Sequence, residues 1–372
     1  MAHPRRRGTP RRRRRPGRGH RVRGAHGGAV SAPAAAARER AGEPRTLVVK
    51  VGGSLVSDKR TDDHLDATAV RAYAALVADL VRTFPGRTVF VAGGGALGHG
   101  AVRDLDTADD FAALGLTRAT FAVKWAWTSA FREAGIRAMP LQVAAMCADR
   151  PSGAVADLTV VRRLLAEGVL PVLSGDCVLT ADGGLRIYGS DHVPGMLVDG
   201  PLAPVRIVTL TDVPGILTGT GPDGPVLSWV SPDDPSPAHA VVWQTASWDT
   251  SDAMRGKVDA MVAHARRGAE CVITRGDPNA ASLHHLLAPM SRWPADVPHT
   301  LISRTRPAPP RPGTPGRPVP PTAFRPRPTP APRQPAPEEI PACPPPPPRP
   351  PPAAWSCSTP ARSTSTRTYA PP

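Results

Sequence analysis

The sequence predicts an α/β protein with an open sheet of mostly parallel strands. Short β-type runs alternate with helical patterns through the middle of the chain, which is typical of a parallel sheet covered by helices. Four glycine-rich or polar segments each follow one of the expected strands: residues 52–54, 93–99, 175–176 and 211–212. Ligands of such sheets bind outside the carboxyl ends of the strands, so we expect these four segments to meet at one rim.

The first expected strand, residues 47–51, is an apolar run that contains Lys50. Gly52 and Gly53 end it, and backbone N–H groups beside glycines can approach an anion closely because no Cβ blocks the way. Lys50 and Lys59 would each supply a positive charge to a phosphate. Taken alone, the segment is explained equally well by a glycine turn with solvated lysines.

A helix is expected over residues 67–83, where apolar residues recur at helical spacing, and a buried strand over 88–92. A glycine turn at 93–95 follows, with His99 just beyond it. Residues 93–98 also match the dinucleotide pattern GxGxxG, but that interpretation leaves the lysines without a role, and the P-loop pattern GxxxxGK[ST] is absent from the sequence.

The central part of the chain continues the alternation. A helix is expected over 117–134, an apolar stretch over 141–146 and a second helix over 158–167. The strand that follows ends at Gly175 and Asp176. The pattern therefore brings a third polar segment to the rim.

The last part of the pattern contains two strands and one helix. A strand over 205–210 leads into Thr211 and Asp212, and a helix over 250–267 has Met254 on its apolar face. A strand over 271–274 closes the alternation. No internal repeat is recognisable.

One folded domain, residues 46–302, is expected between two extensions. Residues 1–45 carry 14 arginines and two glutamates, and residues 303–372 carry ten arginines, two glutamates and many prolines. Since the whole chain has a net charge of +15, the middle is mildly acidic, near −5. The extensions lack the apolar residues that a core needs, so we expect them to be disordered. A basic arm for nucleic acid is one interpretation; a solvated extension, or translation from a start codon placed too far upstream, is favoured.

The five cysteines stand singly, without CxxC or a Cys/His spacing typical of zinc, so no residue is assigned as a metal ligand. No apolar run approaches about 18 residues, and no hydrophobic segment follows the basic N-terminus. We therefore expect a cytoplasmic protein with no membrane partner and no nucleic-acid partner.

Five motifs together resemble the amino acid kinase superfamily: KVGGS (50–54), AGGGALGHG (92–100), GD (175–176), TLTDVPGI (209–216) and SDAMRGK (251–257). Within it, the glycine loop ending in histidine resembles the isopentenyl phosphate kinase branch and the related fosfomycin kinases. Four further segments make fosfomycin kinase the closer resemblance: PLQVAAMC (140–147), SWDTSDAM (247–254), ARRGAEC (265–271) and RGDP (275–278). The resemblance covers residues 46–302.

The resemblance implies the amino acid kinase fold, an open, mostly parallel sheet of about eight strands sandwiched by helices, and a homodimer. It implies ATP-dependent transfer of the γ-phosphoryl group to the phosphonate of fosfomycin, with Mg²⁺ bridging the ATP phosphates. The first alternative is a kinase of isopentenyl phosphate or of another small phosphate or phosphonate. The second is a catalytically silent protein that contacts nucleic acid through its basic extensions.

The resemblance also implies roles for individual residues. Lys50 and Lys257 would neutralise the transferring group, Asp212 would hold the two lysine heads in place, and His99 completes the catalytic set. The acceptor would be bound by Lys59, Ser54, Gly94, Gly95, His99, Ser190 and Ser251. The nucleotide would be bound by Lys50, Gly52, Gly53, Thr211, Asp212, Gly215 and Lys257.

The surroundings of His99 are expected to distinguish the acceptors. An apolar wall would favour the isoprenoid phosphate, whereas a small polar cage would favour fosfomycin. Five positions depart from the fosfomycin kinase pattern: Gly189 replaces a serine, Ser251 a threonine, Asp252 a glycine, Pro214 an acidic residue and Leu97 a phenylalanine. Gly189 removes one donor to a phosphonate, and Asp252 adds a negative charge beside the polyphosphate.

Overall fold

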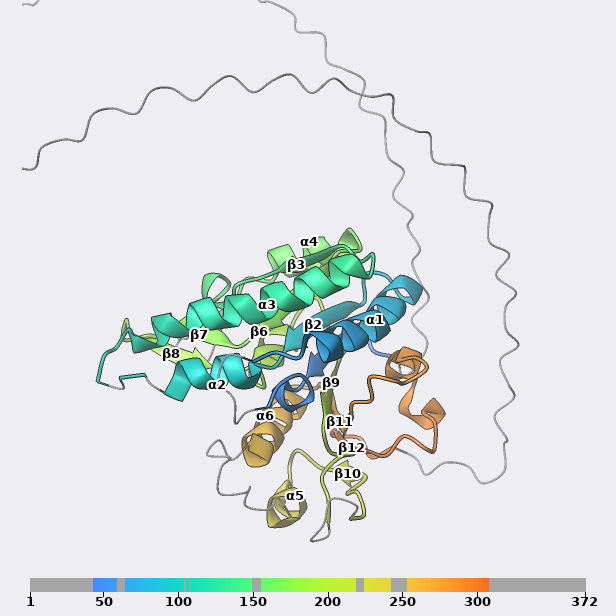
Figure 1. Ribbon diagram of the computed structural model, residues 1–372. Helices are drawn as coiled ribbons and strands as arrows, with labels where there is room; N and C mark the ends of the chain where they lie inside the picture. The colour runs from blue at the N-terminus through green and yellow to red at the C-terminus, as the bar shows by residue number, and fades with distance from the viewer. Residues whose placement is uncertain are drawn as a thin grey trace, which may run out of the picture. The chain divides into compact units, whose positions relative to one another are not determined.

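The computed structural model describes residues 43–58, 64–103, 105–106, 108–148, 155–218, 224–241 and 253–307 (Figure 1). The predictions for Lys59, Ser251, Asp252 and most of the two extensions lie outside these residues. Within them, no helix is both long and apolar enough to span a bilayer.

The main sheet has eight strands in the order β10-β12-β11-β9-β1-β2-β6-β3. Their bounds are β1 Thr46–Val51, β2 Thr88–Ala92, β3 Ala138–Pro140, β6 Leu170–Ser174, β9 Val205–Thr211, β10 Trp229–Val230, β11 Glu270–Arg275 and β12 His299–Ile302. All neighbouring pairs are parallel except β11 and β12. The predicted eight-stranded, mostly parallel sheet is therefore confirmed.

The register of the central strands aligns their carboxyl ends. Val51 of β1 lies opposite Ala92 of β2 and Leu210 of β9, and Ala92 lies opposite Ser174 of β6. The four segments expected to meet at one rim all begin directly after these aligned positions. Their convergence follows from the register.

Helices cover both faces of the sheet. On one face lie α1 (Ala67–Thr83) and α3 (Leu116–Glu133), which pack side by side (Figure 1) and bury Val77 and Trp127 against the strands. On the other lie α4 (Thr159–Ala166) and α6 (Ala253–Arg266), which contribute Val161 and Met261 to a second apolar cluster. Because β-strand side chains alternate between faces, each central strand contributes side chains to both clusters.

The remaining helical elements are short. They are α2 (Gly95–Arg103), α5 (Ser236–Val241) and the 3₁₀ turns η1 (Gly53–Leu55), η2 (Ala112–Gly115), η3 (Val143–Ala145), η4 (Val193–Leu197), η5 (His284–Leu287) and η6 (Met290–Arg292). The helix α2 corrects the sequence analysis, which expected only a glycine turn here. The helix begins at the third glycine of that turn, and His99 lies within it.

A second, four-stranded sheet was not predicted. Its order is β5-β4-β7-β8, with bounds β5 Val155–Ala156, β4 Cys147–Ala148, β7 Asp176–Leu179 and β8 Leu185–Tyr188. The apolar stretch at 141–146 is mainly the turn η3 leading into β4. The β7–β8 hairpin matters most, because pairing of Asp176 with Tyr188 returns the chain to the rim beside Gly175.

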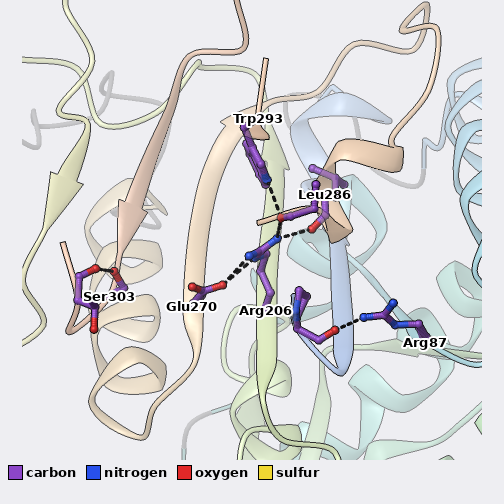
Figure 2. Close-up of polar contacts among 9 residues, drawn as sticks. Arg87, Arg206, Glu270, Leu286, Trp293 and Ser303 are labelled. Atoms are coloured by element: carbon purple, nitrogen blue, oxygen red, sulfur yellow. Dashed lines mark hydrogen bonds and ion pairs between the residues drawn. The ribbon is translucent and has the colours of Figure 1, made fainter. Parts of the chain in front are cut away.

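A buried arginine holds the opposite end of β9. The Arg206 guanidinium lies between the carboxylate of Glu270 and the carbonyls of Leu286 and Ala288 (Figure 2). It donates to Glu270 Oε2 at 2.9 and 2.7 Å and to Leu286 O at 2.8 Å, while Trp293 Nε1 donates to Ala288 O at 3.3 Å. This cluster fixes the 283–293 segment to the sheet, away from the rim.

Candidate functional site

A cavity of about 1170 Å³ opens at the rim, where the carboxyl ends of the central strands meet. All four segments expected there contribute to its lining, from Gly52, Gly93, Gly175 and Thr211 onward. The turn after β8 and the start of α6 add further residues, among them Asp191 and Lys257.

The two glycine loops touch backbone to backbone. A Cβ on Gly53 would lie 2.5 Å from the backbone nitrogen of Gly95, and one on Gly93 would lie 2.4 Å from the nitrogen of Gly53. No side chain fits at either position, so glycine is required for this approach. The result is a wall made of main chain, in which peptide N–H groups and the amino end of α2 lie close to the cavity.

Ser57 connects the same two loops. Its hydroxyl donates to Gly53 O at 3.0 Å and accepts from the Ala96 N–H at 2.9 Å. The sequence analysis missed this residue, because nothing distinguishes a serine in a loop from its neighbours before the second loop is placed beside it.

Two buried lysines share one carboxylate. Lys50, on β1, forms an ion pair with Asp191 Oδ1, and Lys257 Nζ, on α6, lies 3.4 Å from the same oxygen. Lys50 and Lys257 are only 2% and 8% exposed, whereas the Asp191 side chain is 26% exposed. A single anion of the protein thus holds two cations at the cavity wall.

Burial and charge shift the pKa values of this group. Burial lowers the pKa of Lys50 to about 8; the Asp191 carboxylate raises it, and the neighbouring Lys257 lowers it further. For Asp191, burial alone would raise the pKa, but the two lysines outweigh burial and hold it well below its usual range. At neutral pH the group carries two positive charges and one negative charge, and its surplus positive charge is suited to a polyanionic ligand.

Asp191 lies between the two lysines, whereas the sequence analysis assigned this role to Asp212. The Asp212 carboxylate lies on the cavity wall but accepts from the Thr211 hydroxyl at 2.9 Å. Asp191 holds the lysines because the β7–β8 hairpin returns it to the rim. Without that hairpin, the sequence offered Asp212 as the nearest carboxylate after a central strand.

Most other predicted residues line the cavity: Ser54, Gly94, Gly95, His99, Ser190 and Thr211. His99 lies on α2, and Val102 follows it by three residues on the same helix, so the two side chains are neighbours. Leu116 of α3 and Ile187 and Tyr188 of β8 also line the cavity. Val102, Leu116 and Ile187 are apolar, which is the kind of surface that the sequence analysis associated with an isoprenoid phosphate.

Gly215, expected to contact the nucleotide, does not line the cavity. Its φ is +154°, and a Cβ there would lie 2.7 Å from Thr300 Oγ1. That hydroxyl accepts from the Ile216 N–H at 2.8 Å, so the glycine permits close packing of this loop against β12.

The amino acid kinase family matches residues 45–275. An isopentenyl phosphate kinase from Haloferax volcanii is 29% identical over 183 residues, 47% of this chain and 72% of the relative. Another from Methanothermobacter thermautotrophicus is 27% identical over 249 residues, 61% and 90% respectively. A glutamate 5-kinase from Symbiobacterium thermophilum is 28% identical over 205 residues, 53% and 76% respectively.

Solved structures share the fold. The product complex of an isopentenyl phosphate kinase from T. acidophilum has a TM-score of 0.52 at 19% identity, covering 69% of this chain and 99% of that one. A substrate complex of an isopentenyl phosphate kinase has a TM-score of 0.51 at 18% identity, covering 69% of this chain and 100% of that one. At such identities the likeness establishes the fold alone.

Proposed function

This chain belongs to the amino acid kinase family and is a phosphotransferase acting on small phosphate-containing substrates, and from that premise we propose its acceptor. We propose that it transfers the γ-phosphoryl group of ATP to the phosphate of a small monoester with a short apolar chain, for which isopentenyl phosphate is the reference compound. The bond from the γ-phosphorus to the β-phosphate oxygen breaks, a bond to an acceptor phosphate oxygen forms, and ADP leaves.

The observation that carries the proposal is the Lys50–Asp191–Lys257 group at the cavity wall. Donor, acceptor and transition state are all anionic, so catalysis depends mainly on positioning and charge compensation. Two ammonium groups fixed by one carboxylate supply that charge without having to reorganise during the reaction. We assign Lys50 and Lys257 to the transferring group and Asp191 to holding them.

The cavity suits ATP and its metal. The glycine loops offer main-chain N–H groups to phosphate oxygens, and about 1170 Å³ exceeds the volume of most small-molecule sites, leaving room for an acceptor. Mg²⁺ bound to ATP would neutralise phosphate charge, with phosphate oxygens and water as its main ligands; Asp191 and Asp212 are among the carboxylates that line the cavity.

The acceptor assignment rests on the wall beside His99. An imidazole can donate to the acceptor phosphate, while Val102 and Ile187, 36% and 40% exposed, present apolar surface to the cavity. Covering that surface with an apolar acceptor chain is favourable, by about 25 cal/mol for each Å² removed from water. The names of two curated relatives point to the same acceptor class.

A panel of acceptors tests the assignment. The full chain is incubated with Mg-ATP and, separately, isopentenyl phosphate, fosfomycin and glutamate, and the products are identified by mass spectrometry. We expect ADP and a diphosphate from isopentenyl phosphate. Lys257→Met, purified identically, controls for a contaminating kinase. Turnover of glutamate alone, or of no acceptor, would contradict the proposal.

Fosfomycin is the second candidate acceptor. The segments PLQVAAMC, ARRGAEC and RGDP favour it, because they resemble fosfomycin kinases beyond the shared motifs. Turnover of fosfomycin with no reaction of isopentenyl phosphate would assign this activity instead.

Two further expectations stay proposals. The homodimer is tested by light scattering of the purified protein. Nucleic-acid binding through the basic extensions, the non-enzymatic alternative, predicts binding that weakens strongly with salt and is lost when residues 1–45 are removed.

A further inference from the structure

One helix contacts Asp191 at two points. Lys257 and His264 are seven residues apart on α6, so they lie two turns apart on the same side of the helix. Lys257 Nζ lies 3.4 Å from the Asp191 carboxylate, and His264 Nε2 lies 2.9 Å from the Asp191 main-chain oxygen. The side chain and the main chain of Asp191 are therefore both tied to α6.

The direction of the second bond is fixed by its acceptor. A carbonyl oxygen can only accept, so Nε2 of His264 carries the hydrogen and donates. Burial lowers the pKa of His264 to about 4, and the nearby His192 and Arg267 lower it further, while Asp191 acts in the opposite direction. Near neutral pH the ring is therefore uncharged, with its hydrogen on Nε2.

The ring occupies a space that Gly195 leaves open. His264 is 4% exposed. A Cβ on Gly195 would lie 2.7 Å from His264 Cε1 and 2.9 Å from Nδ1. Gly195 lies in η4, directly after the turn that contains Asp191. The residue that packs against the His264 ring and the residue that accepts its hydrogen bond therefore belong to the same short segment.

Asp191 itself lies in a turn between β8 and η4. Within the turn, the N–H groups of His192 and Val193 donate to Gly189 O at 2.9 and 3.3 Å. They close the turn but do not fix it to α6, which carries Lys257. The hydrogen bond from His264 makes that connection at the residue whose carboxylate must meet both lysines.

We propose that His264 is a positioning residue for phosphoryl transfer: it fixes the main chain of Asp191 so that the carboxylate faces Lys50 and Lys257 together. The inference rests on the proposed function, because it gives His264 a part in that reaction. His264 acts through Asp191 and does not line the cavity.

Variants of His264 separate positioning from folding. His264→Leu removes the donor, and a misplacement of about 1 Å at the reacting groups costs on the order of a hundredfold in rate. We expect kcat to fall about 10- to 100-fold with the KM for ATP and acceptor little changed. His264→Gln, whose amide nitrogen can occupy the place of Nε2, is expected to recover most of the rate. Equal activity of the Leu variant and the parent would overturn the proposal, as would failure of Gln to recover.

A substitution at Gly195 disturbs the position of the His264 ring without changing His264 itself. Gly195→Ala should displace the ring and reduce kcat like His264→Leu, and adding it to His264→Leu should cost little more. Gly115→Ala is the matched control, because its Cβ would meet Leu105 at an ordinary 3.9 Å. Additive losses in the double variant would show that the two residues act separately, against the proposal.

A measurement without turnover distinguishes failure of this inference from failure of the proposed function. ¹H–¹⁵N spectra of the histidine rings in the parent protein should show His264 as the neutral Nε2–H tautomer between pH 6 and 8. An Nδ1–H tautomer, or titration near pH 6.5, would overturn the positioning role even if kinase activity is found. If no acceptor is turned over while this tautomer is observed, the hydrogen bond stands but the positioning role fails with the proposed function.

Discussion

Lys50 and Asp191 form an ion pair although 141 residues separate them in the chain. Lys50 reaches the rim on the central strand β1, and Asp191 reaches it through the β7–β8 hairpin of the second sheet. Because Lys257 meets the same carboxylate oxygen, a change at Asp191 affects both lysines at once.

Asp191→Asn is expected to reduce kcat more than any other single carboxylate change at the rim. An amide of the same shape leaves two buried ammonium groups without their shared anion, so their positions and charges are disturbed together. We expect a loss of about 100-fold or more, by analogy with the removal of one group that stabilises transition-state charge. Steady-state kinetics with the active acceptor measure it.

Asp212→Asn is the comparison for that variant, because the sequence analysis had given Asp212 the same role. A smaller loss is expected, since the Asp212 carboxylate bonds the Thr211 hydroxyl. Asp259→Asn, on the exposed side of α6, serves as the surface control. A larger loss for Asp212 than for Asp191 would reverse the assignment.

The rate is expected to fall as pH rises through about 8, the pKa to which burial lowers Lys50. The ammonium form binds phosphate and the neutral amine does not, so the active form is present below this pH and lost above it. The logarithm of kcat/KM for ATP, which reports the free enzyme, should decline by about one for each pH unit above the break.

Lys50→Arg checks which group causes that decline. A guanidinium keeps its charge throughout the accessible pH range, so the residual activity of this variant should lack the break. A break that persists unchanged in Lys50→Arg would assign it to another group.

The rim was predictable from the sequence because its strands are continuous apolar runs that end in glycine or polar residues. Once β1, β2, β6 and β9 are parallel and in register, Gly52, Gly93, Gly175 and Thr211 must lie together. Asp191 was not predictable in the same way. The strands β7 and β8 have only four residues each, and the hairpin they form is visible only through its pairing.

Contacts that residues make across the fold could not be predicted from the local sequence pattern either. The spacing of apolar residues in α6 predicted its buried face, but His264 is a polar residue after them, and it contacts a main-chain oxygen 73 residues away. Likewise, Gly215 stands in a motif that suggested a nucleotide contact, whereas its neighbour in space is Thr300. A residue's partner across the fold decides its role in both cases.

Arg206→Met is expected to destabilise the protein without changing the rate per folded molecule. The substitution leaves Glu270 without its partner and removes a donor from the carbonyls of Leu286 and Ala288. Breaking a buried ion pair by removing one member costs about 3–5 kcal/mol. Because Glu270 is partly exposed, we expect the lower end of that range, measured as the free energy of unfolding in urea.

The matched change for Arg206 is Glu270→Gln, which keeps an acceptor and should cost less. Arg206 lies five residues from Thr211 on β9, about 17 Å at 3.3–3.4 Å per residue, so kcat should be unaffected. A large loss of kcat in folded Arg206→Met would contradict its purely structural role.

Ile187→Ser is expected to weaken binding of the acceptor and to leave binding of the nucleotide unchanged. Ile187 lines the cavity on β8 with its side chain 40% exposed, so an apolar acceptor chain would cover it. A change of even one methylene in an apolar pocket alters discrimination by about 10-fold or more, so the KM for isopentenyl phosphate should rise about 10-fold with the KM for ATP unchanged. Leu179→Ser is the matched control, because Leu179 is 48% exposed on the neighbouring strand β7 and does not line the cavity. Equal effects of the two substitutions would mean that the wall beside His99 does not contact the acceptor.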